Sequence, residues 1–354
     1  MPHPIIESAA FAIQPLFLSD EAGAPLCVPL VQSTFAIVAP DRLEREEVQP
    51  EPSLTGELWG EDAGTSSYRM EPPCAFTKPG TDIVLVGHAQ ARRARHDELL
   101  VTFRVGPVGK QVRVTGDRVW ARTMGSIQAT RPLLFDRMPL CYERAFGGWD
   151  RSSPDPTAHA FEQRNPVGTG FRAPGSPFEE GLRLPNLEDP GDTLGQPGQA
   201  VRPAGFGFTS PDWQPRLSMA GTFDEAWQRE RMPLMPRDFD RRFYNAASPG
   251  LVSLARLRGD EPVLVENASP LGRLSFRLPG ERPPACRIAL SYGPTVEIAL
   301  ALDTVIVDTD ASRVTLLYRG HVALRNGPHD VRSIHLGNEG QSRSVQGNGE
   351  ARWA

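Results

Sequence analysis

The first third of the chain alternates short apolar runs with turn residues, and this pattern predicts β-strands. In one run Val112 and Val114 fall on one face while Arg113 and Thr115 fall on the other, as in a half-buried antiparallel strand. The preceding residues 106–109, Gly-Pro-Val-Gly, form a favourable hairpin connection. The strands predicted here are 26–38, 82–87, 99–105 and 111–116.

The last third repeats this pattern at close intervals. Its predicted strands are 251–257, 263–266, 274–278, 286–290, 296–302, 304–307 and 313–318. Regular short strands separated by turns are typical of an antiparallel sandwich or barrel. We therefore expect a mainly β fold, with sandwich- or barrel-like sheets formed by the N-terminal and C-terminal thirds and few short helices.

Residues 120–250, here called the central segment, show no sustained periodicity of either kind. The segment is rich in proline and glycine, and the whole chain has 33 glycines and 35 prolines, which indicates many turns. Its many aromatic residues are not typical of disorder. We expect an ordered connection laid over the sheets.

Two helical turns are predicted inside the central segment. Thr222 and Glu225 have the spacing of a capping box ahead of residues 226–229. A second turn is expected at residues 238–243, where Phe239 and Phe243 are i,i+4 neighbours.

The domain organisation follows from these patterns. We expect one domain over 1–335, which could consist of two β subdomains at about 10–120 and 250–325 joined by the central segment. Residues 41–79 are acidic and proline-rich and predict an exposed excursion, and residues 336–354 predict a flexible tail.

Charge and composition narrow the classes of partner. Lys plus Arg number 38 and Asp plus Glu 43, a net charge of −5, so the chain offers no global basic field for nucleic acid or an anionic membrane. The N-terminus lacks the pattern of a secretory signal, and no run of apolar residues is long enough to span a bilayer. The four cysteines are isolated in the sequence. A cytoplasmic protein with reduced thiols is expected.

Residues 142–150, Tyr-Glu-Arg-Ala-Phe-Gly-Gly-Trp-Asp, and residues 164–171, Arg-Asn-Pro-Val-Gly-Thr-Gly-Phe, form the most distinctive stretch, here called the central motif. Gly147-Gly148 allows positive φ, and Pro166 pushes the residue before it toward extended geometry. Charge-assisted hydrogen bonds could hold this irregular path. The charged candidates are Glu143, Arg144, Asp150 and Arg164. An internal loop clamp and a partner-binding surface are both open interpretations.

Other constellations do not support catalysis or cofactor binding. The seven histidines are scattered, and Asp303, Asp308 and Asp310 indicate a strand-turn-strand hairpin rather than a calcium loop. Residues 168–170 and 205–207 resemble fragments of phosphate loops but lack the lysine and the third glycine. No catalytic residue, metal site, cofactor or small-molecule substrate is expected. Five arginines could face an acidic protein partner, or be solvated or internally paired: Arg122, Arg131, Arg137, Arg144 and Arg151.

Several ordered stretches, together with the central motif, resemble a bacterial family first catalogued as domain of unknown function 2169 and since associated with type VI secretion. These stretches are 78–87, 114–120, 184–186, 203–207, 213–216, 220–227, 238–245 and 303–308. The resemblance covers roughly residues 10–325. It implies a cytoplasmic, non-enzymatic adaptor or chaperone that binds a type VI effector, a VgrG-type spike protein, or both.

The resemblance does not identify contact residues, so its motif positions are candidates for either partner binding or loop clamping. They are Glu143, Arg144, Phe146, Gly147, Gly148, Asp150, Arg164, Asn165, Pro166, Gly168, Gly170, Phe171, Trp213, Arg216, Asp238, Asp240 and Phe243. One rival hypothesis is a carbohydrate- or cell-wall-acting hydrolase that uses Glu143 and Asp150 as paired carboxylates. Another is a structural component of the secretion apparatus.

Overall fold

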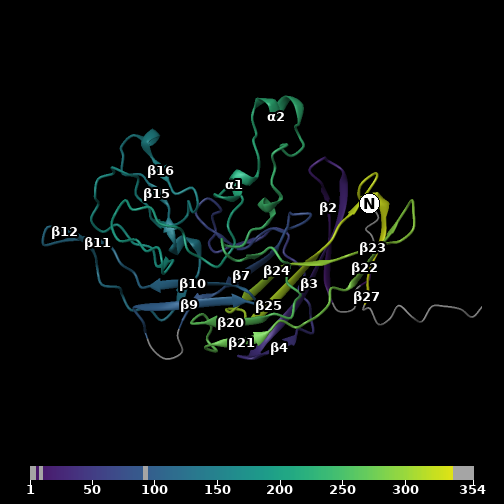
Figure 1. Cartoon of the computed structure of the whole chain (residues 1–354), viewed down its shortest axis with the longest axis horizontal. Coiled ribbons are helices and arrows are strands. Elements are labelled where there is room, and N and C mark those ends of the chain that lie inside the picture. Colours follow the sequence, from purple (N-terminus) through teal and green to yellow (C-terminus); the bar gives the residue numbers. More distant parts are fainter. Residues whose placement is uncertain (1–4, 8–10, 91–94, 338–354) are drawn as a thin grey trace, which may run out of the picture.

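The computed structural model describes residues 5–7, 11–90 and 95–337, and these form a mainly β protein (Figure 1). Strands account for 41% of the chain and helices for 7%, which confirms the predicted fold class. Among the described residues the sheets are antiparallel for the most part, and none closes into a barrel. Residues 338–354 of the predicted tail lie outside the described ranges.

The largest sheet combines strands from both thirds of the chain. Its path is β19-β7-β24-β25-β3-β2, with β4 and β26 also paired to β3. Its bounds are β19 Val252–Ser253, β7 Thr81–Val86, β24 Ala301–Asp308, β25 Arg313–Arg319, β3 Pro25–Ala39, β2 Ala12–Ser19, β4 Arg42–Arg45 and β26 Val322–Ala323. Strands β7 and β24 pair in parallel. Every residue of β7 is buried: Thr81 and Asp82 begin the strand, and residues 83–86 form the apolar run expected inside a sheet.

A five-stranded sheet, β18-β10-β9-β20-β21, packs against the first. Its strands are β18 Leu187–Glu188, β10 Val108–Thr115, β9 Glu98–Val105, β20 Pro262–Glu266 and β21 Leu274–Arg277. The predicted hairpin joins β9 to β10 through Gly106 and Pro107. Alternate residues of β9 are buried, and its Phe103 meets Phe206 edge to face with ring centroids 6.2 Å apart. One apolar cluster includes buried side chains of both sheets, so they share a core.

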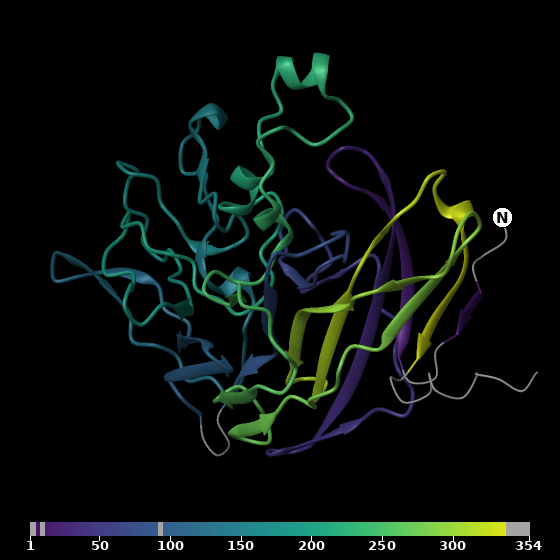
Figure 2. The same ribbon diagram turned by 45° about the vertical axis from the view of Figure 1, so that its right-hand side comes forward.

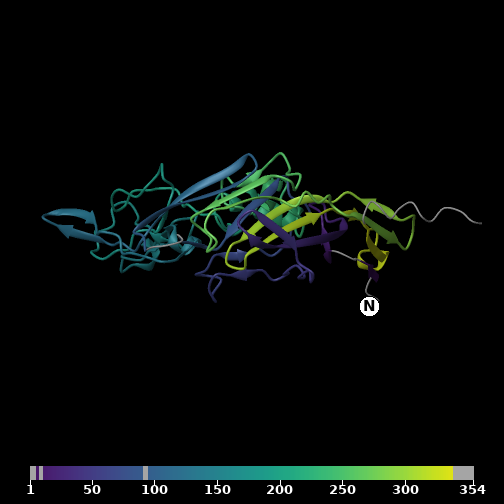
Figure 3. The ribbon, with the colours of Figure 1, turned by 90° about the horizontal axis from the view of Figure 1, so that it is seen from below.

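A third sheet, β1-β27-β22-β23, lies at the end of the molecule opposite residues 120–129, the start of the central segment (Figure 3). It contains β1 Ile5–Glu7, β27 Val331–Gly337, β22 Ala285–Leu290 and β23 Val296–Ile298. The strands β1, β2 and β27 were not predicted.

Three sequence predictions need correction. The strand expected at 251–257 is only the two-residue β19, after which Leu254 is 73% exposed because the chain leaves the sheet. The run expected at 296–302 breaks between Ile298 and Ala301. The strand expected to begin at Thr304 instead continues through a bulge at Asp303, whose carboxylate is buried against Arg319 at 2.6 Å.

Residues 41–79, which were predicted to form an exposed acidic excursion, are more buried than expected. It contributes β4 and the short pair β5 Glu57–Leu58 and β6 Tyr68–Met70. Phe76 and Lys78 are 4% and 5% exposed, because the chain passes beneath the central segment before it enters β7. The turn residues indicated a loop, but not that its second half is covered.

The central segment is ordered; its first, teal part lies at one end of the sheets, and its later, green part rises above their middle (Figures 1 and 2). Its short elements are β11 Trp120–Thr123, β12 Ser126–Ala129, β13 Met138–Pro139, η1 Tyr142–Arg144, β14 Phe146–Gly147, β15 Trp149–Asp150, η2 Pro156–Ala158, β16 Ala160–Phe161, β17 Thr169–Gly170, α1 Arg216–Met219, α2 Glu225–Glu230 and η3 Arg241–Tyr244. β13 pairs with β8 His88–Ala89, and η4 Pro328–Asp330 precedes β27. The segment has its own small core, which includes Trp120, Phe146 and Leu184.

Helix α2 sits on an arm that projects from the body (Figure 2). Its N-cap is Asp224, whose carboxylate accepts a hydrogen bond from the Trp227 amide, and not Thr222 as predicted. The Thr222 hydroxyl instead donates to Asp238. No helix in the described ranges is sufficiently long and apolar to cross a bilayer.

Candidate functional site

The central motif folds into two short strand pairs that require its glycines. β14 pairs in parallel with β17, and β15 pairs antiparallel with β16. Gly147 and Gly148 have φ of +154° and +94°. A Cβ on Gly147 would lie 2.1 Å from the Asn165 carbonyl oxygen, and a Cβ on Gly148 would lie 2.3 Å from the Gly168 carbonyl oxygen. These positions therefore exclude side chains both by conformation and by space.

The second half of the motif is equally tight. A Cβ on Gly168 would lie 2.3 Å from Asn165 Nδ2, and Gly170 has φ of +96° with Pro185 beside it. The amide of Gly168 donates to the carbonyl of Asn165, which places Pro166 at the second position of a turn where its fixed φ is favourable.

Asn165 joins the two halves of the motif. Its side chain is fully buried, and Nδ2 donates to the carbonyl oxygens of Tyr142 at 2.8 Å and Phe146 at 3.0 Å. Phe146 is 1% exposed and meets the ring of Phe171 with centroids 6.3 Å apart. The motif thus has an amide clamp and an aromatic base.

The first two charged residues of the motif contact other parts of the chain. The Glu143 carboxylate accepts hydrogen bonds from the Ser66 hydroxyl at 2.9 Å and from the Ser67 amide and hydroxyl, both at 2.7 Å. Arg144 Nη1 donates to Asp117 and to Asn186, each at 3.2 Å. Glu143 thereby ties the motif to the loop before β6, and Arg144 ties it to the loops after β10 and before β18.

Asp150 is almost fully buried and ionised. Arg172 Nη1 donates to its carboxylate at 2.7 Å, and the Ser176 hydroxyl and the Ala173 amide donate at 2.5 and 3.0 Å. Burial alone would raise the pKa of Asp150, but hydrogen bonds from Ser176, Ser152 and Ala173 outweigh it and hold the pKa well below its ordinary value. This carboxylate organises a loop and is poorly suited to donate a proton.

Arg164 forms a fork with Glu162, with both hydrogen bonds at 2.7 Å, and its Nη2 also donates to the Val201 carbonyl at 3.0 Å. The four charged motif residues therefore contact four different sets of groups. Among the described residues no ion pair joins one of them to another. The Glu143 and Asp150 carboxylates, paired in the hydrolase hypothesis, belong to separate networks.

Two aromatic rings of the motif region remain on the surface. Trp149 is 45% exposed and Phe161 is 39% exposed, and they stack across the β15-β16 pair with centroids 4.5 Å apart. The Arg151 guanidinium lies 5.0 Å from the Trp149 ring centroid. An exposed indole that contacts both a second ring and a guanidinium is typical of a binding surface.

The remaining predicted residues lie beside the motif. Trp213 is 3% exposed and meets the Tyr142 ring edge to face at 5.4 Å. Arg216 Nε donates to the Phe243 carbonyl at 3.0 Å, and its guanidinium lies 5.2 Å from the Phe243 ring centroid. A further donor of Arg216 lies 2.7 Å from the Glu71 carboxylate. These residues fix the base of the projecting arm.

Two carboxylates stabilise the same base. Asp238 accepts hydrogen bonds from the amide and the hydroxyl of Thr222, at 3.0 and 2.7 Å. Asp240 caps η3 through the Arg242 amide and also pairs with the Arg242 side chain. The predicted Phe239–Phe243 contact is present, with centroids 5.7 Å apart, but Phe243 lies on the 3-10 helix η3 and Phe239 precedes it.

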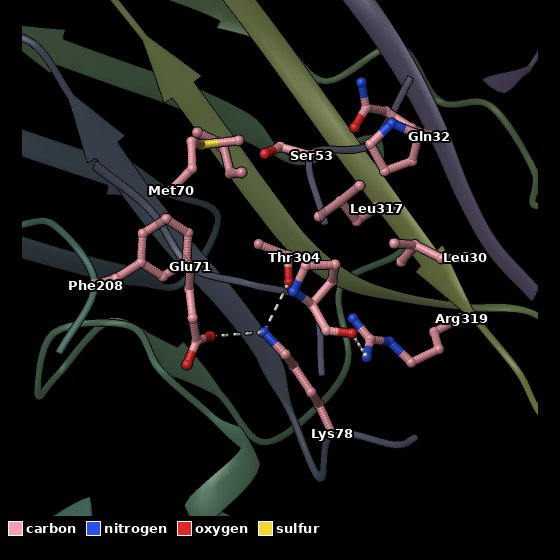
Figure 4. Close-up of a pocket in the computed structure, with 13 residues that line it drawn as sticks. Leu30, Gln32, Ser53, Met70, Glu71, Lys78, Phe208, Thr304, Leu317 and Arg319 are labelled. Carbon is pink, nitrogen blue, oxygen red and sulfur yellow. Dashed lines mark hydrogen bonds and ion pairs between the residues drawn. The ribbon is translucent and has the colours of Figure 1, made fainter. Parts of the chain in front are cut away.

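A buried ionic network below the arm was missed by the sequence reasoning (Figure 4). Lys78 Nζ lies 2.7 Å from Asp82 and 3.2 Å from the Thr304 hydroxyl, and Glu71 approaches it at 4.0 Å. Burial raises the pKa of Glu71, although the charges of Arg216 and Lys78 oppose the shift. Glu71, Lys78 and Thr304 line a small cavity with a volume of about 30 Å³, enough for ordered water.

The available signal for this network was a lysine and an aspartate four residues apart at the start of an apolar strand. Charged residues in that position are ordinarily read as strand-end surface groups. Their partner Asn245, which donates to Asp82 at 2.9 Å, lies too far along the chain to be inferred. Among the described residues, histidine, cysteine and carboxylate groups do not gather into a set that could hold a metal ion.

The fold and this region define a mainly β protein whose loops are held by buried polar clamps. The family model for uncharacterized proteins conserved in bacteria (DUF2169) matches residues 22–319, and the chain belongs to this family. No curated protein and no solved structure gives a significant match.

Proposed function

We propose that this protein is a non-enzymatic adaptor or chaperone that binds a type VI secretion effector and helps to load it onto a VgrG-type spike. The observation that carries the proposal is the exposed Trp149–Phe161 stack, which is displayed on loops fixed from beneath by Asn165 and Asp150. The resemblance of the ordered motifs to secretion adaptors supplies the system in which such a surface would act.

The physical basis is pre-organisation. Ordering a flexible loop during association costs free energy, so a loop already held in place leaves more of the contact energy for affinity. Tryptophan and arginine dominate many binding surfaces because they combine a large apolar area with a polar edge. Trp149 and Arg151 present this combination on a rigid framework.

A binding role also agrees with the state of the two motif carboxylates. Glu143 is held by three donors from Ser66 and Ser67, and the pKa of Asp150 is lowered. A glycosidase acid requires a raised pKa, whereas hydrogen bonds lower the pKa of Asp150. A cytoplasmic location, before the effector leaves the cell, belongs to this proposal.

The test is co-purification from the native host with a tagged full-length chain. The wild type should recover an effector or spike protein encoded beside its gene, and deletion of the gene should abolish secretion of that effector. The double variant Trp149→Ala/Phe161→Ala should recover at least about tenfold less. Leu254→Ala, at a 73% exposed apolar position outside the central segment, is the matched control and should behave as wild type.

If neither an effector nor a spike protein is recovered and secretion is unchanged, the adaptor proposal is wrong. Permanent co-purification with sheath or baseplate proteins would instead identify a structural component of the apparatus. Equal recovery by the two variants would show that the aromatic stack is not part of the interface.

A further inference from the structure

A hollow of about 690 Å³ lies beside the central motif, and its charged lining comes from segments far apart in the sequence. We define the arginine hollow by Asp117, Arg118, Arg131, Glu143, Arg144 and Arg183. We propose that the arginine hollow binds an acidic polypeptide segment of the protein's partner. This inference rests on the adaptor function proposed above, because it assigns that function a recognition site.

Packing of the motif builds the hollow. The loop after β10 supplies Asp117 and Arg118, and the residues after β12 supply Arg131. Arg183 is placed by its backbone bridge to Val119. Arg144 then closes one side, held by its hydrogen bond to Asp117. Only two of the five arginines grouped by the sequence analysis, Arg131 and Arg144, lie here.

The arginines differ in whether their guanidinium groups already pair with other groups of the protein. Arg118 donates to the buried Glu188 at 2.8 Å, and Arg144 pairs with Asp117 at 3.2 Å. Arg131 and Arg183 are exposed, and their side chains have no hydrogen-bond or ion-pair partner among the described residues. These two guanidinium groups, together with the unused donors of Arg144, can donate paired hydrogen bonds to carboxylates.

The edge of the arginine hollow is apolar, which indicates a second property of its ligand. Leu133 lines the hollow and is 65% exposed, and the adjacent Leu134 is 62% exposed. Two neighbouring exposed leucines would gain from contact with an apolar side chain of the ligand. The surface therefore suits an acidic segment with an apolar residue beside its carboxylates.

The lining favours carboxylates on a polypeptide over nucleic acid. Asp117 and Glu143 lie among the arginines, so a closely spaced row of phosphates would meet two carboxylates in the same hollow. Singly charged side chains spaced along a peptide can avoid both carboxylates.

The experiment measures binding of a fluorescein-labelled peptide rich in glutamate and leucine to the full-length protein by fluorescence anisotropy. The comparison ligand is the same peptide with every glutamate replaced by glutamine. The test variant is Arg131→Glu/Arg183→Glu. The matched control is Arg104→Glu/Arg258→Glu, which changes the net charge equally at two exposed arginines outside the hollow. Circular dichroism and thermal unfolding verify that both variants are folded.

We expect the wild type and the control to bind the acidic peptide similarly, and the test variant to bind at least about tenfold more weakly. Binding should weaken with salt and be lost with the glutamine peptide. Several results would overturn the inference: no binding by the wild type, equal loss in both variants, or equal affinity for the two peptides. Displacement by inorganic phosphate or by single-stranded DNA at comparable concentration would overturn it as well.

Failure here is distinguishable from failure of the adaptor function. If the wild type recovers its effector or spike and the Arg131→Glu/Arg183→Glu variant recovers it equally well, the adaptor role stands and the arginine hollow is not its recognition site. If no partner is recovered from the host although the peptide result is positive, the acidic-segment site stands without the secretion role.

Discussion

The side-chain nitrogen of Asn165 donates a hydrogen bond to the carbonyl oxygen of Tyr142 at 2.8 Å, across 23 residues of sequence. This contact closes the central motif, because Tyr142 begins its first half and Asn165 lies near the start of its second. The same nitrogen also bonds to Phe146, so one buried amide holds both ends of a short turn of backbone. The clamp uses both hydrogens of one amide nitrogen.

Replacement of Asn165 by alanine should destabilise the protein by about 2–4 kcal/mol, because it removes two buried hydrogen bonds and leaves a small cavity. Urea unfolding measures the loss. Asn326→Ala, at an exposed asparagine, should change stability by no more than about 0.5 kcal/mol. Equal stability of the two variants would show that the amide clamp contributes little.

The requirement for glycine in the central motif has two causes that can be measured separately: a positive φ and the lack of space for a side chain. Gly148 and Gly175 have similar φ, +94° and +85°, but a Cβ at Gly148 would lie 2.3 Å from a carbonyl oxygen whereas Gly175 has open space. Gly175→Ala should cost about 1 kcal/mol from backbone strain alone. Gly148→Ala should cost about 3 kcal/mol or more, since a backbone clash is added. Similar costs in denaturant unfolding would contradict the packed geometry of the motif.

Much of the β framework is predictable from the sequence because burial leaves a local pattern. Strands β9 and β10 show alternation, and four consecutive apolar residues, 83–86, form most of β7. Strand β2 was missed because Pro15 interrupts a short run, and β27 because it merges into a polar tail. Pattern reasoning detects strands that bury one whole face and misses those at interruptions.

The site was only partly predictable, for a different reason. The glycines and Pro166 indicate a fixed irregular path, and the structure shows that path. The partners of the charged residues are not local: Glu143 bonds to Ser66 and Ser67, and Arg144 to Asp117 and Asn186. Such pairings depend on the folding of distant loops, which no spacing in the motif encodes.

Charge reversal at Arg144 separates scaffold from interface. Its side chain is 37% exposed, so the loss of its contacts with Asp117 and Asn186, with new repulsion from Asp117, should cost only about 1–2 kcal/mol. Arg144→Glu should therefore remain folded by circular dichroism while it weakens partner recovery. Global unfolding at 25 °C would instead identify Arg144 as an essential part of the scaffold.

The four cysteines should differ sharply in reactivity. Burial raises the pKa of Cys27, Cys141 and Cys286 to about 12, whereas Cys74 is exposed. Because alkylation requires the thiolate, iodoacetamide at pH 8 should modify one thiol in the folded protein and all four in denaturant. Mass spectrometry counts the labels, and Cys74→Ser should remove native labelling. Rapid labelling of a second thiol would show that the core opens locally.

The pH dependence of stability tests the role of Asp150. Because hydrogen bonds hold its folded-state pKa below the unfolded value, the carboxylate stabilises the protein above the ordinary aspartate pKa of about 3.9, and this contribution is lost as pH falls toward the folded pKa. Thermal unfolding from pH 7 to pH 3 should therefore show Asp150→Asn less stable than wild type near neutrality, with the difference shrinking below about pH 4.

The control is Asp155→Asn. Asp155 is an exposed N-cap that accepts a hydrogen bond from the Thr157 amide, and an asparagine side chain can accept the same bond. Its difference from wild type should be smaller at pH 7 and change less with acid. A difference for Asp150→Asn that instead grows as pH falls would mean that the buried carboxyl has a raised pKa. That result would return Asp150 to consideration as a proton donor and count against the loop-clamping role on which the adaptor proposal depends.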